Sequence, residues 1–329
     1  MVSIGYGLMS EEHTAPQLVE NARRAEETGF SFAVVSDHFH PWTRDQGESA
    51  FVWSTLGAIS QATERLVLGT GVTCPTIRTH PAIIAQAAAT TATLMPGRFF
   101  LGVGSGENLN EHILGDPWPR PAQRLEMLEE AIDVIRLLWR GGLQSHEGRH
   151  YTVDRARIFS LPERLPPIMV AASGPVSASL AARKGDGLIA VAPSSDVAER
   201  YREGGGGPRI GLLHICWAET EQAARDTVME FWPKAGISGA LSQELPLPEQ
   251  FEAAAQTVRE EDFTEKVPLG PDPEPVVKKI EQFVEAGYDH VYLHQIGPDQ
   301  EGFFRFYREE LATRLQPEPA RAEALAAAV

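Results

Sequence analysis

The 329-residue sequence has few cysteines, a deficit of basic side chains and no long apolar run. Its two cysteines, Cys74 and Cys216, are far apart, which argues against a disulfide framework or a zinc site. Because 29 Lys and Arg face 45 Asp and Glu, the net charge of −16 disfavours nucleic acid and anionic membranes as partners. No run of about 18 apolar residues and no signal peptide is present. We therefore expect a cytoplasmic protein that acts on a small molecule.

Short apolar runs alternate with longer helical patterns along the chain. Several runs are apolar throughout, as in parallel strands that are buried on both faces. Eight such alternations in about 310 residues favour a single (β/α)8 TIM barrel over residues 1–329, although a doubly wound sheet has the same alternation. The expected strands are Ser3–Leu8, Phe32–Ser36, Arg65–Thr70, Phe99–Val103, Ile168–Ala171, Gly187–Ala190, Ile210–Cys216 and His290–His294.

Two segments interrupt the alternation. Residues 236–272 are too long for a plain connection between the seventh and eighth strands, so we interpret them as an insertion that forms a lid or side wall of the site. Residues 316–329 begin with Gln-Pro-Glu-Pro, continue as an alanine-rich stretch, and are expected to form a frayed tail.

Polar residues and glycines follow four of the predicted strands, at the end of a barrel where active sites lie. They occupy residues 37–42, 71–75, 104–111 and 172–175. Glycines in the last two segments allow a ligand to approach backbone N–H groups, and the fifth-strand segment opens a helix whose dipole favours phosphate. No Gly-x-Gly-x-x-Gly opens a β-α-β unit, which counts against a Rossmann dinucleotide site.

Three of these side chains are candidates for chemistry. His38 can change its protonation near neutral pH, and Glu107 follows a glycine turn at the barrel mouth, where a carboxyl group can handle protons. Trp42 is suited to form an aromatic wall for a substrate. Each also has a plain alternative: a solvated histidine, a helix-capping carboxylate and a hydrophobic filler.

A metal site is the alternative use of His38. His38 and His40 form a His-x-His pair, which His294 could join, so a metal-dependent amidohydrolase is the competing hypothesis. Pro41 indicates a turn directly after the pair, and no further Asp or His stands at a distinctive spacing. We therefore expect no metal.

Four segments, in this order, resemble the deazaflavin-dependent branch of the luciferase-like superfamily. The resemblance runs from Gly5 to about Leu315 and is strongest to glucose-6-phosphate dehydrogenases that use coenzyme F420. It implies an oxidoreductase that moves a hydride between the CH–OH group of an alcohol, sugar or sugar phosphate and F420, and a homodimer. An FMN-dependent monooxygenase and a non-catalytic cofactor-binding barrel remain alternatives. The segments are residues 36–42 (SDHFHPW), 69–76 (GTGVTCPT), 102–111 (GVGSGENLNE) and 171–175 (AASGP).

The resemblance also implies roles for single residues. His38 would be the catalytic histidine, Glu107 would exchange a proton with the cofactor ring, and Trp42 would pack at the reacting centre. Either Glu11 or Glu12 would match an acidic residue near the site. We assign Glu12, together with Trp42 and Ser194, to the substrate. Gly71 and Val72 would form a bulge with a cis peptide bond behind the ring, and the implied cofactor contacts are Asp37, Gly71, Val72, Cys74, Ser105, Gly106, Asn110, Ser173, Gly174, Val176 and Ser177.

The sequence departs from these relatives in two places. Residues 192–195 read Ala-Pro-Ser-Ser where the relatives have a lysine that holds phosphate, and only Lys234, Arg259 and Lys266 are basic candidates in and beside the insertion. Cys74 stands where the relatives have a threonine that contacts the cofactor. A neutral hydroxylated substrate is therefore at least as consistent with the sequence as a phosphorylated one.

Overall fold

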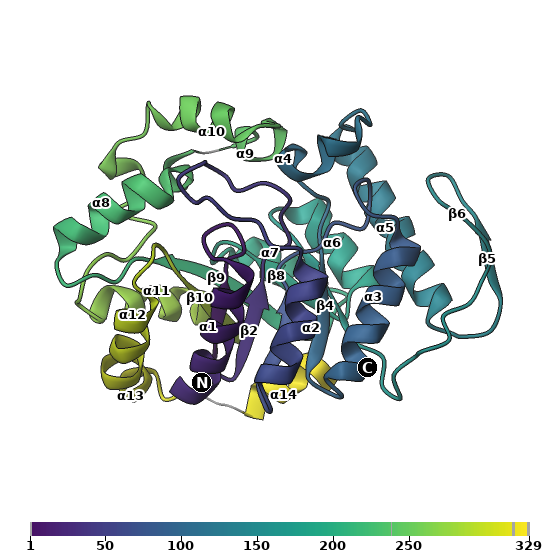
Figure 1. The fold of residues 1–329 in the computed structure, drawn as a ribbon, viewed down its shortest axis with the longest axis horizontal. Coiled ribbons are helices and arrows are strands. Elements are labelled where there is room, and N and C mark those ends of the chain that lie inside the picture. The colour runs from purple at the N-terminus through teal and green to yellow at the C-terminus, as the bar shows by residue number, and fades with distance from the viewer. Residues whose placement is uncertain (1, 238, 318–319, 328–329) are drawn as a thin grey trace.

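Eight parallel strands form a closed barrel in the order β1-β10-β9-β8-β7-β4-β3-β2 (Figure 1). The computed structural model describes residues 2–237, 239–317 and 320–327. The closed barrel confirms the predicted (β/α)8 fold and rules out the doubly wound sheet. The barrel strands are β1 (Ser3–Leu8), β2 (Phe32–Val35), β3 (Val67–Thr70), β4 (Phe99–Val103), β7 (Ile168–Ala171), β8 (Gly187–Ala190), β9 (Arg209–Ile215) and β10 (His290–Gln295).

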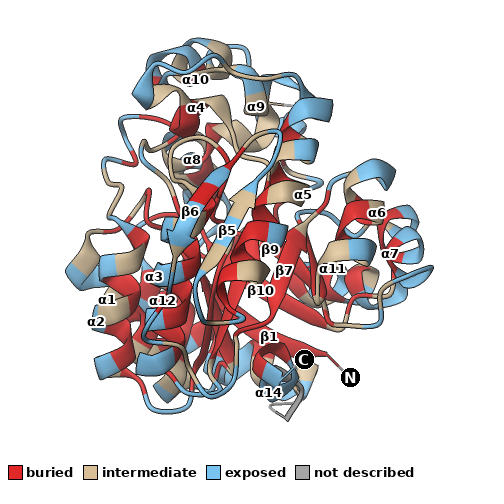
Figure 2. Cartoon of the chain, turned by 90° about the vertical axis from the view of Figure 1, so that its right-hand side faces the viewer, coloured by how far each residue is buried: buried red, intermediate tan, exposed pale blue. Residues whose placement is uncertain are grey.

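Alternate residues of each strand pack on opposite sides of the barrel wall. On β2, Phe32 and Val34 join the cluster inside the barrel, whereas Ala33 joins the cluster beneath the helices. Both sets are buried, which explains why the strands read as continuous apolar runs (Figure 2). Gly69 of β3 is small for a packing reason, because a Cβ there would lie 2.0 Å from the ring of Phe100.

Helices cover the outside of the barrel and connect successive strands. The first begins at a capping box between Thr14 and Gln17 and ends at Gly29, which has a left-handed φ of 100°. No helix in the described ranges is long and apolar enough to cross a membrane. The covering helices are α1 (Ala15–Thr28), α2 (Val52–Ala62), α3 (Pro81–Leu94), α5 (Pro121–Leu138), α6 (Pro175–Lys184), α7 (Ser195–Arg202), α8 (Glu221–Phe231), α11 (Glu274–Glu285), and α12 (Gln300–Phe306), which continues through the π-helical turn Tyr307–Leu311 into α13 (Ala312–Leu315).

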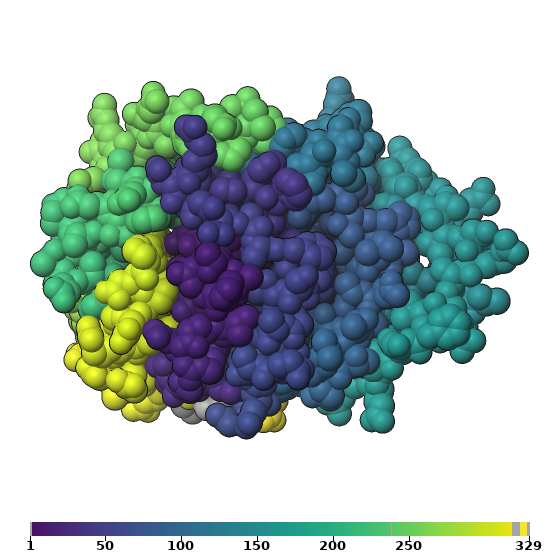
Figure 3. All heavy atoms as spheres, viewed as in Figure 1, coloured from purple at the N-terminus to yellow at the C-terminus, as the bar shows by residue number. Residues whose placement is uncertain are grey.

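Residues 236–272 lie between β9 and β10, beside the loops at the carboxyl ends of the strands. They contain α9 (Leu241–Glu244) and α10 (Pro248–Ala255), which run along the top of the molecule next to α4 (Asn108–Glu111) (Figures 1 and 3). The Nδ2 group of Asn108 donates to the carbonyl of Glu244 at 2.9 Å. The insertion therefore packs on the loop that carries Glu107.

The C-terminal segment closes the other end of the barrel. Ala320–Ala327 form α14, which contacts β1, β3 and β4 (Figure 1). Leu325 and Ala326 are buried in the same interior cluster as Phe32 and Phe100. The expected frayed tail is therefore wrong for these residues, because the open end of the barrel offers an apolar surface and alanine favours the helix that fills it.

Candidate active site

His38 lies at the mouth of the barrel, in the loop that follows β2. Its Nε2 atom is 3.4 Å from Oε1 of Glu11 and 3.6 Å from Oε2 of Glu107, and its ring centroid is 5.0 Å from that of Trp42. Glu11 follows β1 and Glu107 follows β4, so three strand ends meet here. The structure thus brings together the three residues that the sequence analysis proposed as catalytic.

The hydrogen bonds of His38 define what each ring nitrogen can do. Nδ1 lies 3.1 Å from the carbonyl oxygen of His40. A carbonyl only accepts, so Nδ1 carries the proton and Nε2 of the neutral ring has the free lone pair. This nitrogen faces the carboxylates of Glu11 and Glu107, which stabilise the cation that forms when Nε2 takes up a proton. The arrangement suits a general base.

Glu11, rather than Glu12, is the carboxylate that lies next to His38. Glu11 is 2% exposed and accepts hydrogen bonds from the hydroxyls of Ser36 and Ser10. Burial raises the pKa of Glu11, but the interaction with a protonated His38 and the bond from Ser36 outweigh it, so the net shift is downward. Glu12 turns away and accepts from His294 Nε2 at 2.8 Å. The resemblance left the choice between these neighbours open and Glu12 was assigned to the substrate, but in the structure Glu11 is the one beside His38.

A buried ion network lies behind His38. Oδ1 of Asp37 accepts from Nη2 of Arg78 at 2.9 Å, and Oδ2 accepts from the hydroxyl of Thr73 at 2.7 Å. Arg78 also reaches Glu111, with 3.5 Å between Nε and Oε1 and a 2.8 Å bond from its backbone N–H to Oε2. Burial raises the pKa of Glu111, and Arg78 opposes that rise. The network ties together the loops after β2, β3 and β4, and the sequence analysis missed both Arg78 and Glu111.

The loops after β3 and β4 form a wall of small residues. The peptide bond between Gly71 and Val72 is cis, as the resemblance implied. A Cβ on Gly104 would lie 2.5 Å from the Val72 side chain, and one on Gly106, whose φ is 82°, would lie 2.6 Å from Cys74 Sγ. Larger residues would therefore not fit at either glycine, and the loops after β3 and β4 pack closely against each other here.

The start of α6 continues this wall. The backbone N–H groups of Ser173 and Gly174 lie 3.2 and 3.3 Å from the hydroxyl of Ser177. No atom lies within 4 Å of the position of a Cβ on Gly174, so the helix terminus is open. Next to it, Val176 and Arg183 of α6 border a hollow of about 570 Å³ shared with α5 and α7. An open helix N-terminus of this kind suits a phosphate group.

Several predicted site residues have structural partners. Asn110 accepts from the backbone N–H groups of Phe39 and His40 at 2.9 and 3.2 Å, and so holds the loop that carries His38. Ser194 caps α7 by accepting from the N–H of Val197 at 3.4 Å. Cys74 and Ser105 differ in exposure, since Cys74 is buried, which raises the pKa of its thiol, whereas Ser105 is half-buried.

The histidines proposed as metal ligands are held apart. His40 Nδ1 donates to the carbonyl of Leu109 at 2.8 Å, so this ring turns away from His38. His294 bonds to Glu12. Within the described ranges, no three His, Cys, Asp or Glu side chains are arranged to hold a metal ion. The geometry gives the amidohydrolase hypothesis no ligand set.

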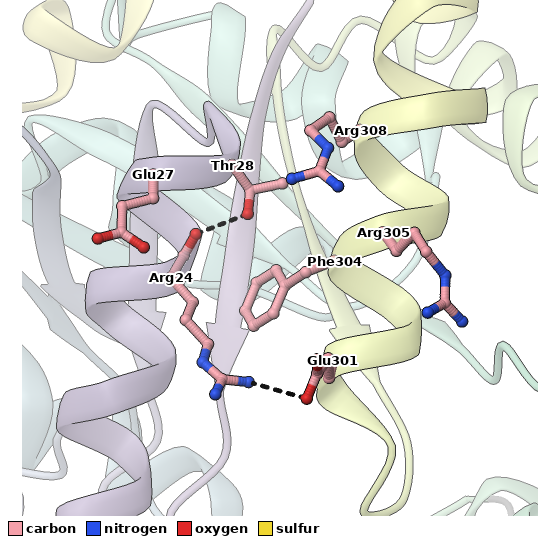
Figure 4. A pocket seen from close by; sticks show the side chains of 7 residues that line it. All are labelled: Arg24, Glu27, Thr28, Glu301, Phe304, Arg305 and Arg308. Carbon is pink, nitrogen blue, oxygen red and sulfur yellow. Dashed lines mark hydrogen bonds and ion pairs between the residues drawn. The ribbon is translucent and has the colours of Figure 1, made fainter.

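A second hollow, of about 260 Å³, lies on the outside of the barrel between α1 and α12 (Figure 4). Arg24 extends across it toward Glu301 at 3.8 Å, while Arg305 points away (Figure 4). None of its lining residues follows a barrel strand, so the hollow is separate from the barrel mouth.

A (β/α)8 barrel with a histidine and two carboxylates at its mouth, and a cis peptide bond between Gly71 and Val72, is the arrangement expected from the flavin-type oxidoreductases that the sequence resembles. The chain belongs to the luciferase-like monooxygenase family, which matches residues 2–290. This confirms the resemblance found in the four sequence segments.

Individual relatives are similar over nearly the whole chain. The F420-dependent glucose-6-phosphate dehydrogenase of Segniliparus rotundus is 34% identical, over 96% of this chain and 98% of that protein. The enzyme of the same name from Microbacterium testaceum is 35% identical, over 95% and 97%. The structure of an F420-dependent secondary alcohol dehydrogenase, bound to an F420–acetone adduct, superposes with a TM-score of 0.86 at 32% identity, over 94% of this chain and 97% of that one.

Proposed function

We propose that the protein is an F420-dependent dehydrogenase that moves a hydride between a CH–OH substrate and the deazaflavin coenzyme. The observation that carries this proposal is the free Nε2 of His38, placed between Glu11 and Glu107 and next to Trp42. Relatives that cover nearly the whole chain and are named as F420-dependent support it. The substrate class is an alcohol, a sugar or a sugar phosphate.

The residues present fit the coenzyme. Gly71, Val72, Ser105 and Gly106 would line its flat ring. Cys74 would support Gly106 from behind, and Asn110 would hold the loop that carries His38. Asp37 would contact the ring from the loop that Arg78 holds. When bound, F420 supplies a carbon that accepts or donates the hydride. The open N-terminus of α6 fits its phosphate, with contacts from Ser173, Gly174, Val176 and Ser177.

The proton chemistry follows from the contacts of His38. Its Nε2 accepts the proton of the substrate hydroxyl as the C–H bond breaks, and the hydrogen bond from Nδ1 to His40 keeps the ring in place. Glu11 and Glu107 stabilise the resulting cation. Glu107 has 29% of its side chain exposed, so it can exchange a proton with solvent. Trp42, which is buried, forms a wall that limits water at the reacting carbon.

Residues 236–272 would act as a lid over this site. Phe251 packs edge-on against Trp42, with 5.1 Å between ring centroids. Arg44, two residues beyond Trp42, pairs with Glu252 of the same segment. Closure over the mouth would keep water from the hydride-transfer step, which is the usual role of such a segment. A cytoplasmic location accords with two free cysteines and the acidic composition.

Titration of the purified protein with F420 and with FMN tests the choice of coenzyme. We expect saturable quenching of F420 fluorescence, with an affinity for F420 at least tenfold higher than for FMN. Gly174→Val should weaken F420 binding about tenfold, because its backbone is extended and its side chain would fill open space at the phosphate site. Unchanged thermal unfolding of this variant is the control for folding. Tight FMN binding without a response to F420 would instead indicate the monooxygenase alternative.

A homodimer is the expected assembly. Phe51, which directly precedes α2, and Ile83, in the first turn of α3, are 59% and 57% exposed, and large apolar side chains of this kind are common at interfaces. Sedimentation equilibrium at micromolar concentration should give a mass of twice the 36.0 kDa chain. Phe51→Asp should shift this equilibrium toward the monomer. A wild-type mass of a single chain would contradict the proposal.

A further inference from the structure

A chain of buried polar groups lies beside the proposed catalytic centre and has no role in the mechanism above. The parallel strands β9 and β10 are in register at His214 and His294, whose Nδ1 atoms are 2.8 Å apart. His294 Nε2 lies 2.8 Å from Oε1 of Glu12, whose Oε2 accepts from the N–H of Gly297 at 2.9 Å. The side chains of His294 and Glu12 are 1% and 2% exposed, whereas His214 is half-buried.

His214 points into the barrel mouth. Ile210 and Leu212 stand four and two residues before it on β9 and belong to the cluster inside the barrel, and side chains of a strand alternate with a period of two. His214 Nε2 has no hydrogen-bond partner among the described residues, yet it is not among their fully buried polar atoms. This nitrogen is therefore the end of the chain that a ligand can reach.

The direction of the hydrogen bonds fixes the character of that nitrogen. The carboxylate of Glu12 only accepts, so His294 donates its Nε2 proton to it. The Nδ1 of a neutral His294 then accepts the Nδ1 proton of His214, which leaves a lone pair on His214 Nε2. Burial, together with the charge of Lys234, lowers the pKa of His214 well below its ordinary value, so its ring stays neutral. His214 presents a hydrogen-bond acceptor to the mouth.

Lys234 presents a donor next to it. It lies in the short helical turn Pro233–Gly236 at the start of the insertion, with its Nζ 2.9 Å from the ring centroid of Trp42 and 5.7 Å from that of Trp232. The ring of His214 packs on the same Trp232, at 5.1 Å between centroids. Lys234 makes no hydrogen bond or ion pair with any described residue, although it is half-buried. Removing an ammonium group from water while its three N–H donors lack acceptors costs free energy, unless a ligand accepts hydrogen bonds from it.

We propose that His214 and Lys234 form a subsite that binds a second hydroxyl group of the substrate, so that the enzyme acts on uncharged polyhydroxylated alcohols. A hydroxyl both donates and accepts, so it can donate to His214 Nε2 and accept from Lys234. A carboxylate or phosphate only accepts, and it would face the lone pair of His214. It would also meet the carboxylates of Glu11 and Glu107, with Lys234 as its only nearby described cation that is not already paired. The inference rests on the proposed function for the reaction that it refines.

Three small substrates that share one reacting carbon test the subsite through F420 reduction. Propane-1,2-diol adds a hydroxyl to propan-2-ol, and lactate adds a carboxylate in its place. We expect kcat/KM to be about tenfold or more higher for the diol than for propan-2-ol, the discrimination expected of one or two hydrogen bonds, and lowest for lactate. His214→Leu and Lys234→Met should each bring the ratio of diol to propan-2-ol to within about threefold of one. Lys278→Met, which removes an exposed lysine of α11, should leave the ratio unchanged.

Nitrogen NMR of the histidine rings tests the subsite without coenzyme or turnover. We expect His214 to be neutral with its proton on Nδ1, and its Nε2 resonance to move when propane-1,2-diol is added, but not with propan-2-ol. Glu12→Gln should alter the His214 tautomer equilibrium, which a role limited to packing would not do. A proton on Nε2 of His214, or a wild-type preference for propan-2-ol or lactate, would overturn the inference. Failure to reduce F420 with all three substrates would overturn the proposed function, while the NMR titration would still decide the subsite.

Discussion

Replacement of His38 by alanine should lower kcat by about 10³-fold while F420 affinity stays within about threefold of wild type. The side chain supplies the lone pair that accepts the hydroxyl proton, and no other described group at the mouth has the same position between Glu11 and Glu107. Turnover is measured by loss of F420 absorbance, and affinity by fluorescence quenching. Added imidazole should restore part of the activity, because it supplies a base to the space that the ring leaves.

Two further variants test whether the loss of turnover in His38→Ala comes from the loss of the proton acceptor. His146→Ala removes a histidine of the outer strand β5 (Gln144–Glu147) that pairs with Glu130 of α5, and it should leave turnover within about twofold of wild type. Glu11→Gln keeps the shape of the side chain beside His38 but removes its charge, and it should lower kcat by about tenfold. If His38→Ala retained more than a tenth of wild-type turnover, the proton acceptor would have to be another group.

The barrel strands were predictable because burial on both faces leaves a continuous apolar run. Ser3–Leu8, Phe99–Val103, Ile168–Ala171 and Gly187–Ala190 have the bounds that the sequence analysis gave them. The antiparallel hairpin of β5 (Gln144–Glu147) and β6 (Thr152–Ala156) was not expected, because it lies outside the barrel and most of its side chains are polar and exposed. Such strands bury too little to produce the alternation that identifies a strand.

The site residues that directly follow a strand could be predicted from the sequence. Those that meet only through strand pairing or through the fold of the insertion could not. His38, Trp42 and Glu107 stand just after strand ends, so the fold alone brings them to one face. His214 and His294 meet only because β9 and β10 are in register, and 80 residues separate them. Lys234 was noted as a basic side chain, but its place above Trp42 depends on how the insertion folds back. Neither arrangement can be inferred from the composition or from the spacing of residues along the chain.

Arg78→Met should lower the free energy of unfolding by about 3–5 kcal/mol at pH 7, because it leaves the buried carboxylates of Asp37 and Glu111 without their cation. Denaturation in urea, followed by tryptophan fluorescence, measures the change. Arg44→Met is the matched control, since Arg44 is 68% exposed and its ion pair with Glu252 is screened by solvent, so its removal should change stability little.

The loss in Arg78→Met should be smaller at pH 5 than at pH 7. Burial already raises the pKa of Glu111 in the folded protein, and removal of Arg78, which opposes that rise, raises it further. A carboxyl whose pKa is higher in the folded state favours folding most at low pH, and this contribution falls as the pH rises above its unfolded pKa. The variant therefore recovers stability on acidification relative to wild type. A loss below about 1 kcal/mol at both pH values would mean that Arg78 does not neutralise these carboxylates, and that the loop carrying His38 is held by the bonds of Thr73 and Asn110 instead.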